Sequence, residues 1–179
     1  MRRLLLLLLM ICVSLPTLAT TVVARSVEEL AERSSHVVVG RAVRTWSQWN
    51  ADQRVVFTYT KFAVERSLKG SAPNTVTVKQ LGGHANGVIQ KVAGARQLHA
   101  GEAAVLFLRP SAQHDGTMAV TSLMQGHFRM KKRDDGEIVV SNGISGASQL
   151  NPAEGTVSNY KGSEMTLRQL EERVRKVAK

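Results

Sequence analysis

Five histidines are the residues of this chain best suited to hold a metal ion: His36, His84, His99, His114 and His127. None of them lies at the short helical or hairpin spacing typical of zinc ligands, and no His-Glu-x-x-His motif is present. A site assembled from two distant loops, for example from His84 and His99, remains an alternative. The spacing favours scattered surface and turn histidines, so we expect no metal and no other cofactor.

Signals for hydrolytic chemistry are weak. The segment Gly143-Ile144-Ser145-Gly146 approaches the Gly-x-Ser-x-Gly pattern of serine hydrolases, but its second glycine comes one residue early and no strand-turn-helix context surrounds it. The adjacent carboxylates at residues 134–135 fall in a predicted hairpin turn, where aspartate is ordinary. We therefore expect no enzymatic activity.

Aromatic rings near cations are the best candidate for a ligand site. Trp46, Trp49 and Tyr59 lie in or near a long predicted strand, close in sequence to Arg44 and Lys61. Aromatic side chains beside cations bind single-stranded nucleic acids or sugars by stacking. The candidate ligand face is therefore Trp46, Trp49, Tyr59 and Lys61. The alternative is that the three rings cap the end of the hydrophobic core.

The first 24 residues have the layout of a secretory signal peptide. Two arginines after the initiator methionine are followed by an apolar run through Leu15, then by Pro16 and small residues. The run is shorter than the roughly 20 residues that span a bilayer as a helix, so we expect cleavage and not a permanent anchor. Ala24 is the preferred cleavage position and Ala19 is the alternative. The expected location is the periplasm or the extracellular medium.

Cleavage after Ala24 would remove 24 of the 179 residues and leave 155, enough for one domain. The single cysteine, Cys12, would leave with the signal, so the core alone must hold the mature chain together. The net charge would fall from +10 to +8, because two arginines leave. This basic excess is spread along the chain and fits either a solvated surface or affinity for polyanions. We expect as partner an unknown protein or a polyanionic envelope ligand, no specific nucleic acid, and no integral membrane segment.

Helices are predicted only at the two ends of the mature chain. Ser26 and Glu29 form a capping-box pattern that begins a short helix. Thr166 can cap a second, amphipathic helix over residues 166–179. Its apolar stripe at helical spacing consists of Leu167, Leu170, Val174 and Val177. We expect this stripe to dock on the rest of the domain, and a membrane surface is the alternative.

Between the helices the sequence predicts short β-strands. In residues 54–68, Val56 and Phe62 share one parity and Tyr59 and Lys61 the other, as in a strand with one buried face. A continuous apolar run over residues 103–108 predicts a strand buried on both faces. Further strands are predicted over 37–43, 75–79, 88–92, 118–123, 128–132 and 137–140. Residues 141–165 are polar, glycine-rich and without periodicity, so we expect a loosely ordered loop. This pattern predicts a mainly β fold, and a barrel in particular.

Several segments carry a resemblance to known proteins. Residues 37–43, 57–70, 76–83, 101–108 and 125–130 resemble a group of short, exported bacterial proteins of unknown function, over most of residues 27–130. More distantly, the Val-Val-Val-Gly strand, the long strand closing on Leu-Lys-Gly and the Val-Thr-Val strand are similar to netrin-like and tissue-metalloproteinase-inhibitor modules. That resemblance implies an OB-like closed or partly open β-barrel over residues 25–140. Those modules carry several disulfides, and the inhibitors use an N-terminal cysteine, which the mature chain lacks.

Three functions follow as hypotheses. The first is an exported, non-enzymatic binding or accessory module of the bacterial envelope or medium. The second is a secreted protease inhibitor or protease partner of netrin-like type, which rests on the resemblance. The third is an unrecognised hydrolase, which we rank last.

Overall fold

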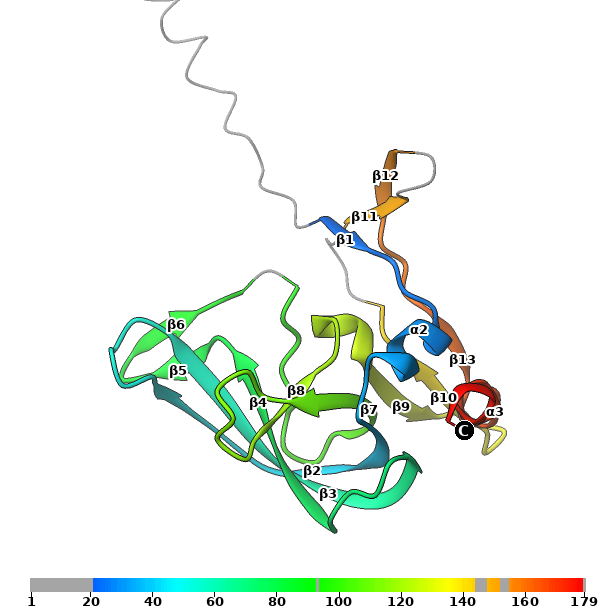
Figure 1. The fold of residues 1–179 in the computed structure, drawn as a ribbon, viewed down its shortest axis with the longest axis horizontal. Helices are drawn as coiled ribbons and strands as arrows, with labels where there is room; N and C mark the ends of the chain where they lie inside the picture. Colours follow the sequence, from blue (N-terminus) through cyan, green and yellow to red (C-terminus); the bar gives the residue numbers. More distant parts are fainter. Residues whose placement is uncertain (1–20, 93, 144–147, 152–154, 179) are drawn as a thin grey trace, which may run out of the picture.

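The computed structural model describes residues 21–92, 94–143, 148–151 and 155–178. The fold is mainly β and is built around a closed five-stranded barrel (Figure 1). Its strands are β2 (His36–Trp49), β3 (Val56–Lys69), β4 (Thr75–Leu81), β7 (Ala103–Pro110) and β8 (Met118–Val120). The ring runs β2, β3, β4, β8, β7 and back to β2, and β4 and β8 are parallel. This Greek-key order confirms the OB-like barrel.

The barrel interior is mostly apolar and buried. β3 alternates as predicted, because Val56, Thr58, Thr60 and Phe62 are buried while the residues between them are more exposed. Phe62 packs with inward residues of the neighbouring strands and with Leu98, which closes one end of the barrel from the loop before β7. The members of this inner core are Val38, Ala42, Phe62, Val76, Val78, Leu98, Ala104, Leu106, Leu108 and Val120.

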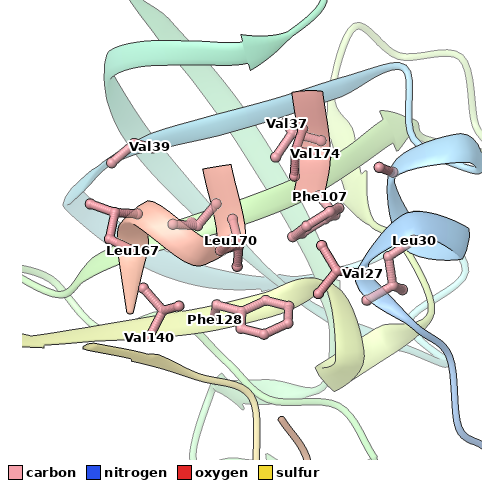
Figure 2. Close-up of a cluster of buried hydrophobic side chains, with 12 residues drawn as sticks. Val27, Leu30, Val37, Val39, Phe107, Phe128, Val140, Leu167, Leu170 and Val174 are labelled. Atoms are coloured by element: carbon pink, nitrogen blue, oxygen red, sulfur yellow. The ribbon is translucent and has the colours of Figure 1, made fainter. Parts of the chain in front are cut away.

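A second core lies outside the barrel wall. The outward residues Val37, Val39 and Phe107 of β2 and β7 are as buried as the inward ones. They are covered by two helices, α2 (Val27–Glu32) and α3 (Leu167–Val177), as Figure 2 shows. This double burial explains the continuous apolar runs of both strands and confirms the prediction for residues 103–108.

Both helices have the predicted caps and contacts. Capping boxes are formed by Ser26 with Glu29 in α2 and by Thr166 with Gln169 in α3. Leu167, Leu170 and Val174 of α3 are buried and Val177 is partly buried in the outer core, so the C-terminal helix docks on the domain. Arg173 of α3 also forms an ion pair with Glu28 of α2, with Nη2 and Oε2 2.5 Å apart. No helix among the described residues is long and apolar enough to cross a membrane.

The sheet branches at β7. Residues 108–110 of β7 pair with β8 and close the barrel, whereas residues 104–106 pair with β9 (His127–Lys132). From β9 the sheet continues to β10 (Ile138–Ser141) and β13 (Glu164–Thr166). A short 3-10 helix, η1 (Leu123–Gly126), connects β8 to β9.

The expectation of a loop over residues 141–165 was wrong. This stretch contains β11 (Ser148–Asn151), β12 (Thr156–Asn159) and the start of β13. β11 and β12 form a small sheet with β1 (Thr21–Val23), which pairs parallel to β11. β12 is exposed at every position, so it has no apolar alternation that would have revealed it in the sequence. A second small hairpin is formed by β5 (Gly83–Ala85) and β6 (Val88–Gln90).

The expected signal peptide lies mostly outside the described residues, which begin at Thr21. The part that is described belongs to the fold. Val22 packs partly buried against Met124 and Tyr160. The Gln125 side chain accepts from the Arg25 amide at 2.8 Å and donates to the Val23 carbonyl at 3.0 Å. Residues 21–25 therefore have specific partners in the domain.

Candidate functional site

One part of the outer barrel surface is left uncovered by the helices. α2 and α3 pack over the first half of β2, and the second half of β2 continues beyond them beside β3 and β4. Because Thr58, Thr60, Val78 and Gln80 point inward, the alternate residues of these strands point outward. We call their outward side the open face. Its cross-strand rows are Gln48, Phe57 and Leu81; Trp46, Tyr59 and Lys79; and Arg44, Lys61 and Thr77.

The centre of the open face is a pair of aromatic rings. Trp46 of β2 and Tyr59 of β3 are cross-strand neighbours, and their ring centroids lie 5.6 Å apart at an interplanar angle of 14°. Both residues are half-buried, so each ring keeps one part in contact with solvent. Two rings stacked on each other from adjacent strands form a rigid apolar cluster on the open face, and its solvent-exposed part can contact a planar ring or a sugar.

Cations lie at both ends of this aromatic pair. The guanidinium carbon of Arg44 is 5.5 Å from the Trp46 ring centroid. On the other side, Lys79 Nζ lies 5.6 Å from the Tyr59 centroid and 4.5 Å from the Phe57 centroid. Lys79 also forms an ion pair of 2.8 Å with Asp115 in the β7–β8 loop. Burial lowers the pKa of Lys79, but the hydrogen bonds and charge interactions with Asp115 and Tyr59 together outweigh burial, so the pKa of Lys79 is raised.

Two further cations face each other in the next row. Arg44 and Lys61 are directly opposite in the β2–β3 register, and both are exposed. Among the ion pairs of the described chain, neither has a carboxylate partner. Like charges on directly opposite residues of a sheet repel each other. An anion bound between them would remove this repulsion, so the row favours an anionic ligand.

The structure separates the residues predicted as a ligand face. Trp46, Tyr59 and Lys61 share the open face, whereas Trp49 does not belong to it. Trp49 is three residues beyond Trp46 in the same strand and pairs with the buried Val56, which places it on the opposite side of the sheet. The structure therefore does not place Trp49 beside the other three residues, because β2 extends to residue 49 and not only to residue 43, and its side chains alternate between the two sides of the sheet.

Sequence reasoning missed Phe57, Lys79 and Asp115. Phe57 and Lys79 have the parity of Tyr59 and could have been found once the register between β3 and β4 was known. Asp115 lies in an irregular loop and reaches Lys79 only through the closure of the barrel. No local sequence signal marks that contact.

A separate polar cluster lies beneath β7 and β9. The Glu102 carboxylate accepts hydrogen bonds from His127 Nε2 at 2.9 Å, from Arg129 Nε at 3.0 Å and from the His99 amide at 3.2 Å. His127 is fully buried, and its Nδ1 has no hydrogen-bond partner in the described part of the chain. Because no ring nitrogen of His127 reaches solvent, this pair fixes the β7 entry loop to β9 and does not have the exposure of a catalytic dyad.

We expect acid to destabilise the protein through this cluster. Burial lowers the pKa of His127, aided by Arg96 and Arg129 and opposed by Glu102, so the unfolded chain takes up a proton before the folded chain does. The stability that neutral His127 provides above about pH 6.5 is therefore lost as the pH falls below that value. The pKa of Glu102 is about 2: burial raises it, and the His127 hydrogen bond and neighbouring cations lower it more strongly. The stabilising contribution of the ionised Glu102 carboxylate is therefore lost as the pH falls from about 4.5 to 2.

Thermal melting between pH 7.5 and 5 checks this expectation. The melting temperature of the wild type should fall over this range, and that of His127→Gln should fall less. His84→Gln, which changes an exposed histidine, is the control and should follow the wild type. Equal pH dependence of wild type and His127→Gln would contradict the assignment.

The remaining candidates from the sequence are placed as follows. His84 and His99 line the same groove beside the β5–β6 hairpin. Within the described residues, however, no group of three or more metal-binding side chains is present. Asp134 and Asp135 lie in the tight β9–β10 turn, as predicted. In this turn the Arg133 amide donates to the Glu137 carbonyl, and the Gly136 amide donates to the Arg133 carbonyl. Of the Gly-x-Ser-like segment, residues 144–146 lie outside the described part of the chain.

Fold and site together define an OB-like barrel with an aromatic and cationic open face. Comparison with known proteins adds no family to this description: no family model matches the chain, and no curated protein matches it.

Proposed function

We propose that this chain is an exported, non-enzymatic binding module that holds an acidic polysaccharide of the bacterial envelope or medium on its open face. The observation that carries the proposal is the Arg44–Lys61 pair beside the stacked rings of Trp46 and Tyr59. These two cations are in register and have no carboxylate partner among the described residues. Sugar rings stack on aromatic side chains and their carboxylates neutralise the cations, so an acidic sugar polymer satisfies both features at once.

The position of the face in the fold supports the same function. In OB-type barrels the second and third strands, with the adjoining loops, are a recurrent site for oligonucleotides and oligosaccharides. Here these strands are β3 and β4, which carry Tyr59, Lys61 and Lys79. The loop between the fourth and fifth barrel strands contributes Asp115, which fixes Lys79 beside the rings.

Alanine substitution of the two tryptophans tests the proposal. With a decamer of galacturonic acid as the probe, Trp46→Ala should weaken binding by about 1–3 kcal/mol, as for loss of one stacked ring. Trp49→Ala is the matched control, because it removes the same side chain from the same strand on the opposite side. Its affinity per folded molecule should equal that of the wild type. Equal losses in both variants, or no saturable binding by the wild type, would refute the proposal.

Ionic strength provides a second expectation for the same complex. Each carboxylate neutralised by Arg44 or Lys61 releases counterions, so the logarithm of the affinity should fall as the logarithm of salt concentration rises. The double variant Arg44→Gln/Lys61→Gln should show a shallower dependence than the wild type. Titrations at two salt concentrations measure both slopes, and identical slopes would show that these cations do not contact the ligand.

Export is part of the proposal, and residues 21–25 favour cleavage after Ala19 over Ala24. Cleavage after Ala24 would remove β1 and Val22, and it would leave the Gln125 amide without its Val23 carbonyl partner. Cleavage after Ala19 keeps these contacts. The intact mass of the exported protein should therefore correspond to a chain that begins at Thr20. A mass that begins at Arg25 would contradict this choice, and an uncleaved chain would contradict processing.

A further inference from the structure

We propose that the opening between β4 and β8 is a binding pocket for an oxyanion, such as a phosphate or carboxylate group, held by Lys79, Arg96 and Arg109. The pocket has a volume of about 120 Å³ and is lined by these three cations together with Leu81, Ala119 and Leu123. It adjoins the open face at Lys79, but it rests on its own observations and does not require a polymer on that face.

The pocket lies where the pairing between two barrel strands, β4 and β8, is shortest. β4 pairs with β3 through residues 75–81, but its pairing with β8 is limited to Val78 and Met118. β8 then follows β7, through Arg109 opposite Ala119 and Leu108 opposite Val120. Beyond Val78, β4 therefore pairs only with β3, and β8 pairs only with β7. Side chains of β4 and β8 line the space between these two strands.

Arg96 is held in place by its own segment of the chain. The buried Gln80 side chain donates from its amide to the Arg96 carbonyl and accepts from the Leu98 amide at 3.1 Å. Leu98 itself is fully buried in the barrel core. At the other end of the segment, the Met124 amide donates to the Gly94 carbonyl at 3.2 Å. Three hydrogen bonds thus fix the backbone around Arg96, so the start of its side chain is held rigidly beside the pocket.

The charge of Arg96 is only partly compensated by the described residues. Its Nη1 atom is buried and has no hydrogen-bond partner within the described residues. The carboxylate that acts on it is Glu102, which already accepts from His127, Arg129 and the His99 amide. Burial lowers the pKa of Arg96, Arg129 lowers it further, and Glu102 opposes both effects. A buried donor on an undercompensated cation gains most from an incoming anion.

The other two cations point to the same ligand chemistry. Arg109 is exposed and has no ion-pair partner among the described carboxylates, and Lys79 has Asp115 alone. The carboxylate of Asp115 therefore neutralises the charge of Lys79. The charge of Arg109 is not neutralised by a described carboxylate, and that of Arg96 is neutralised only in part. An oxyanion presents several acceptor oxygens, and guanidinium groups can bind these in pairs.

The pocket rim distinguishes a free anion from an organic one. Leu81 and Leu123 are 39% and 42% exposed at its edge, which is high for leucine in a small domain. An alkyl group attached to the anion would cover this apolar surface. A free inorganic anion would leave it in water.

Titration of the full exported chain with inorganic phosphate and with butyl phosphate tests the site. We expect saturable binding of the anion and a rise in melting temperature with its concentration. Arg96→Gln should weaken binding about 10-fold or more, as for loss of a charge-assisted hydrogen bond. Arg33→Gln, an exposed arginine at the end of α2, is the matched control and should bind like the wild type. Tighter binding of butyl phosphate identifies an organic ligand, and equal binding identifies free phosphate.

Two outcomes would overturn the proposal. The first is the absence of saturable binding of either probe by the wild type. The second is binding that survives both Arg96→Gln and Arg109→Gln in folded protein, which keeps the test valid should Arg96→Gln fail to fold. Trp46→Ala separates this site from the open face: it should leave phosphate binding unchanged while it weakens binding of the galacturonate decamer.

Discussion

Phe62→Ala is expected to lower the free energy of unfolding by about 3–5 kcal/mol. Phe62 has no exposed surface and lies in the inner core, between β2, β4 and β7. Truncation would leave a cavity that a closed barrel cannot collapse around, because its strands are joined on both sides. Leu106→Ala, also fully buried in the inner core, should cost about 2–5 kcal/mol.

Urea denaturation of Phe62→Ala beside Phe57→Ala measures this effect. Phe57 lies in the same strand on the open face and is half-exposed, so its removal should cost clearly less. A loss of stability in Phe57→Ala as large as in Phe62→Ala would mean that the inward and outward sides of β3 are reversed.

Gly40→Ala is the second substitution with a large expected effect. Gly40 lies in β2 at a shift in the β2–β3 register, where the two backbones approach closely. A Cβ atom at this position would lie 2.0 Å from the carbonyl oxygen of Ala63 and 2.9 Å from the Phe62 ring. The first neighbour is backbone and cannot rotate away, so the two strands would have to separate. We expect a loss of at least about 3 kcal/mol, at the upper end for added volume in a packed site.

Gly87→Ala is the control for this substitution. Gly87 has a positive φ of 78° in the β5–β6 turn, and no atom lies within 4 Å of a Cβ built there. Alanine at residue 87 should therefore cost only the left-handed backbone strain, about 1–2 kcal/mol. A melting temperature of Gly40→Ala equal to or above that of Gly87→Ala would contradict the close approach of β2 and β3.

Much of the fold follows from local patterns in the sequence. The alternation of residues 54–68 predicts β3 and its buried side, and the capping boxes at Ser26 and Thr166 predict both helices. The apolar run at residues 103–108 predicts a strand buried on both sides, and the run at residues 37–43 predicts a strand; the two cores explain both runs. These features are visible because each depends on neighbours a few residues away.

The features that were missed depend on contacts between distant segments. β11 and β12 are short and largely polar, and they form a sheet with a strand more than 100 residues earlier in the chain. The Lys79–Asp115 ion pair forms because the barrel closes. The position of Arg96 depends on the hydrogen bonds of its loop to the Gln80 side chain. Trp49 is a different case: simple alternation along a longer β2 would have separated it from Trp46.

The most direct test of the open face uses the two tryptophans of the chain, one on each side of the sheet. In an NMR titration with the galacturonate decamer, each indole N–H gives its own signal, assigned by the Trp46→Ala and Trp49→Ala variants. We predict that the Trp46 signal shifts in a saturable manner while the Trp49 signal stays in place. A saturable shift of Trp49 with Trp46 unchanged, or binding that moves neither signal, would contradict a ligand site on the open face.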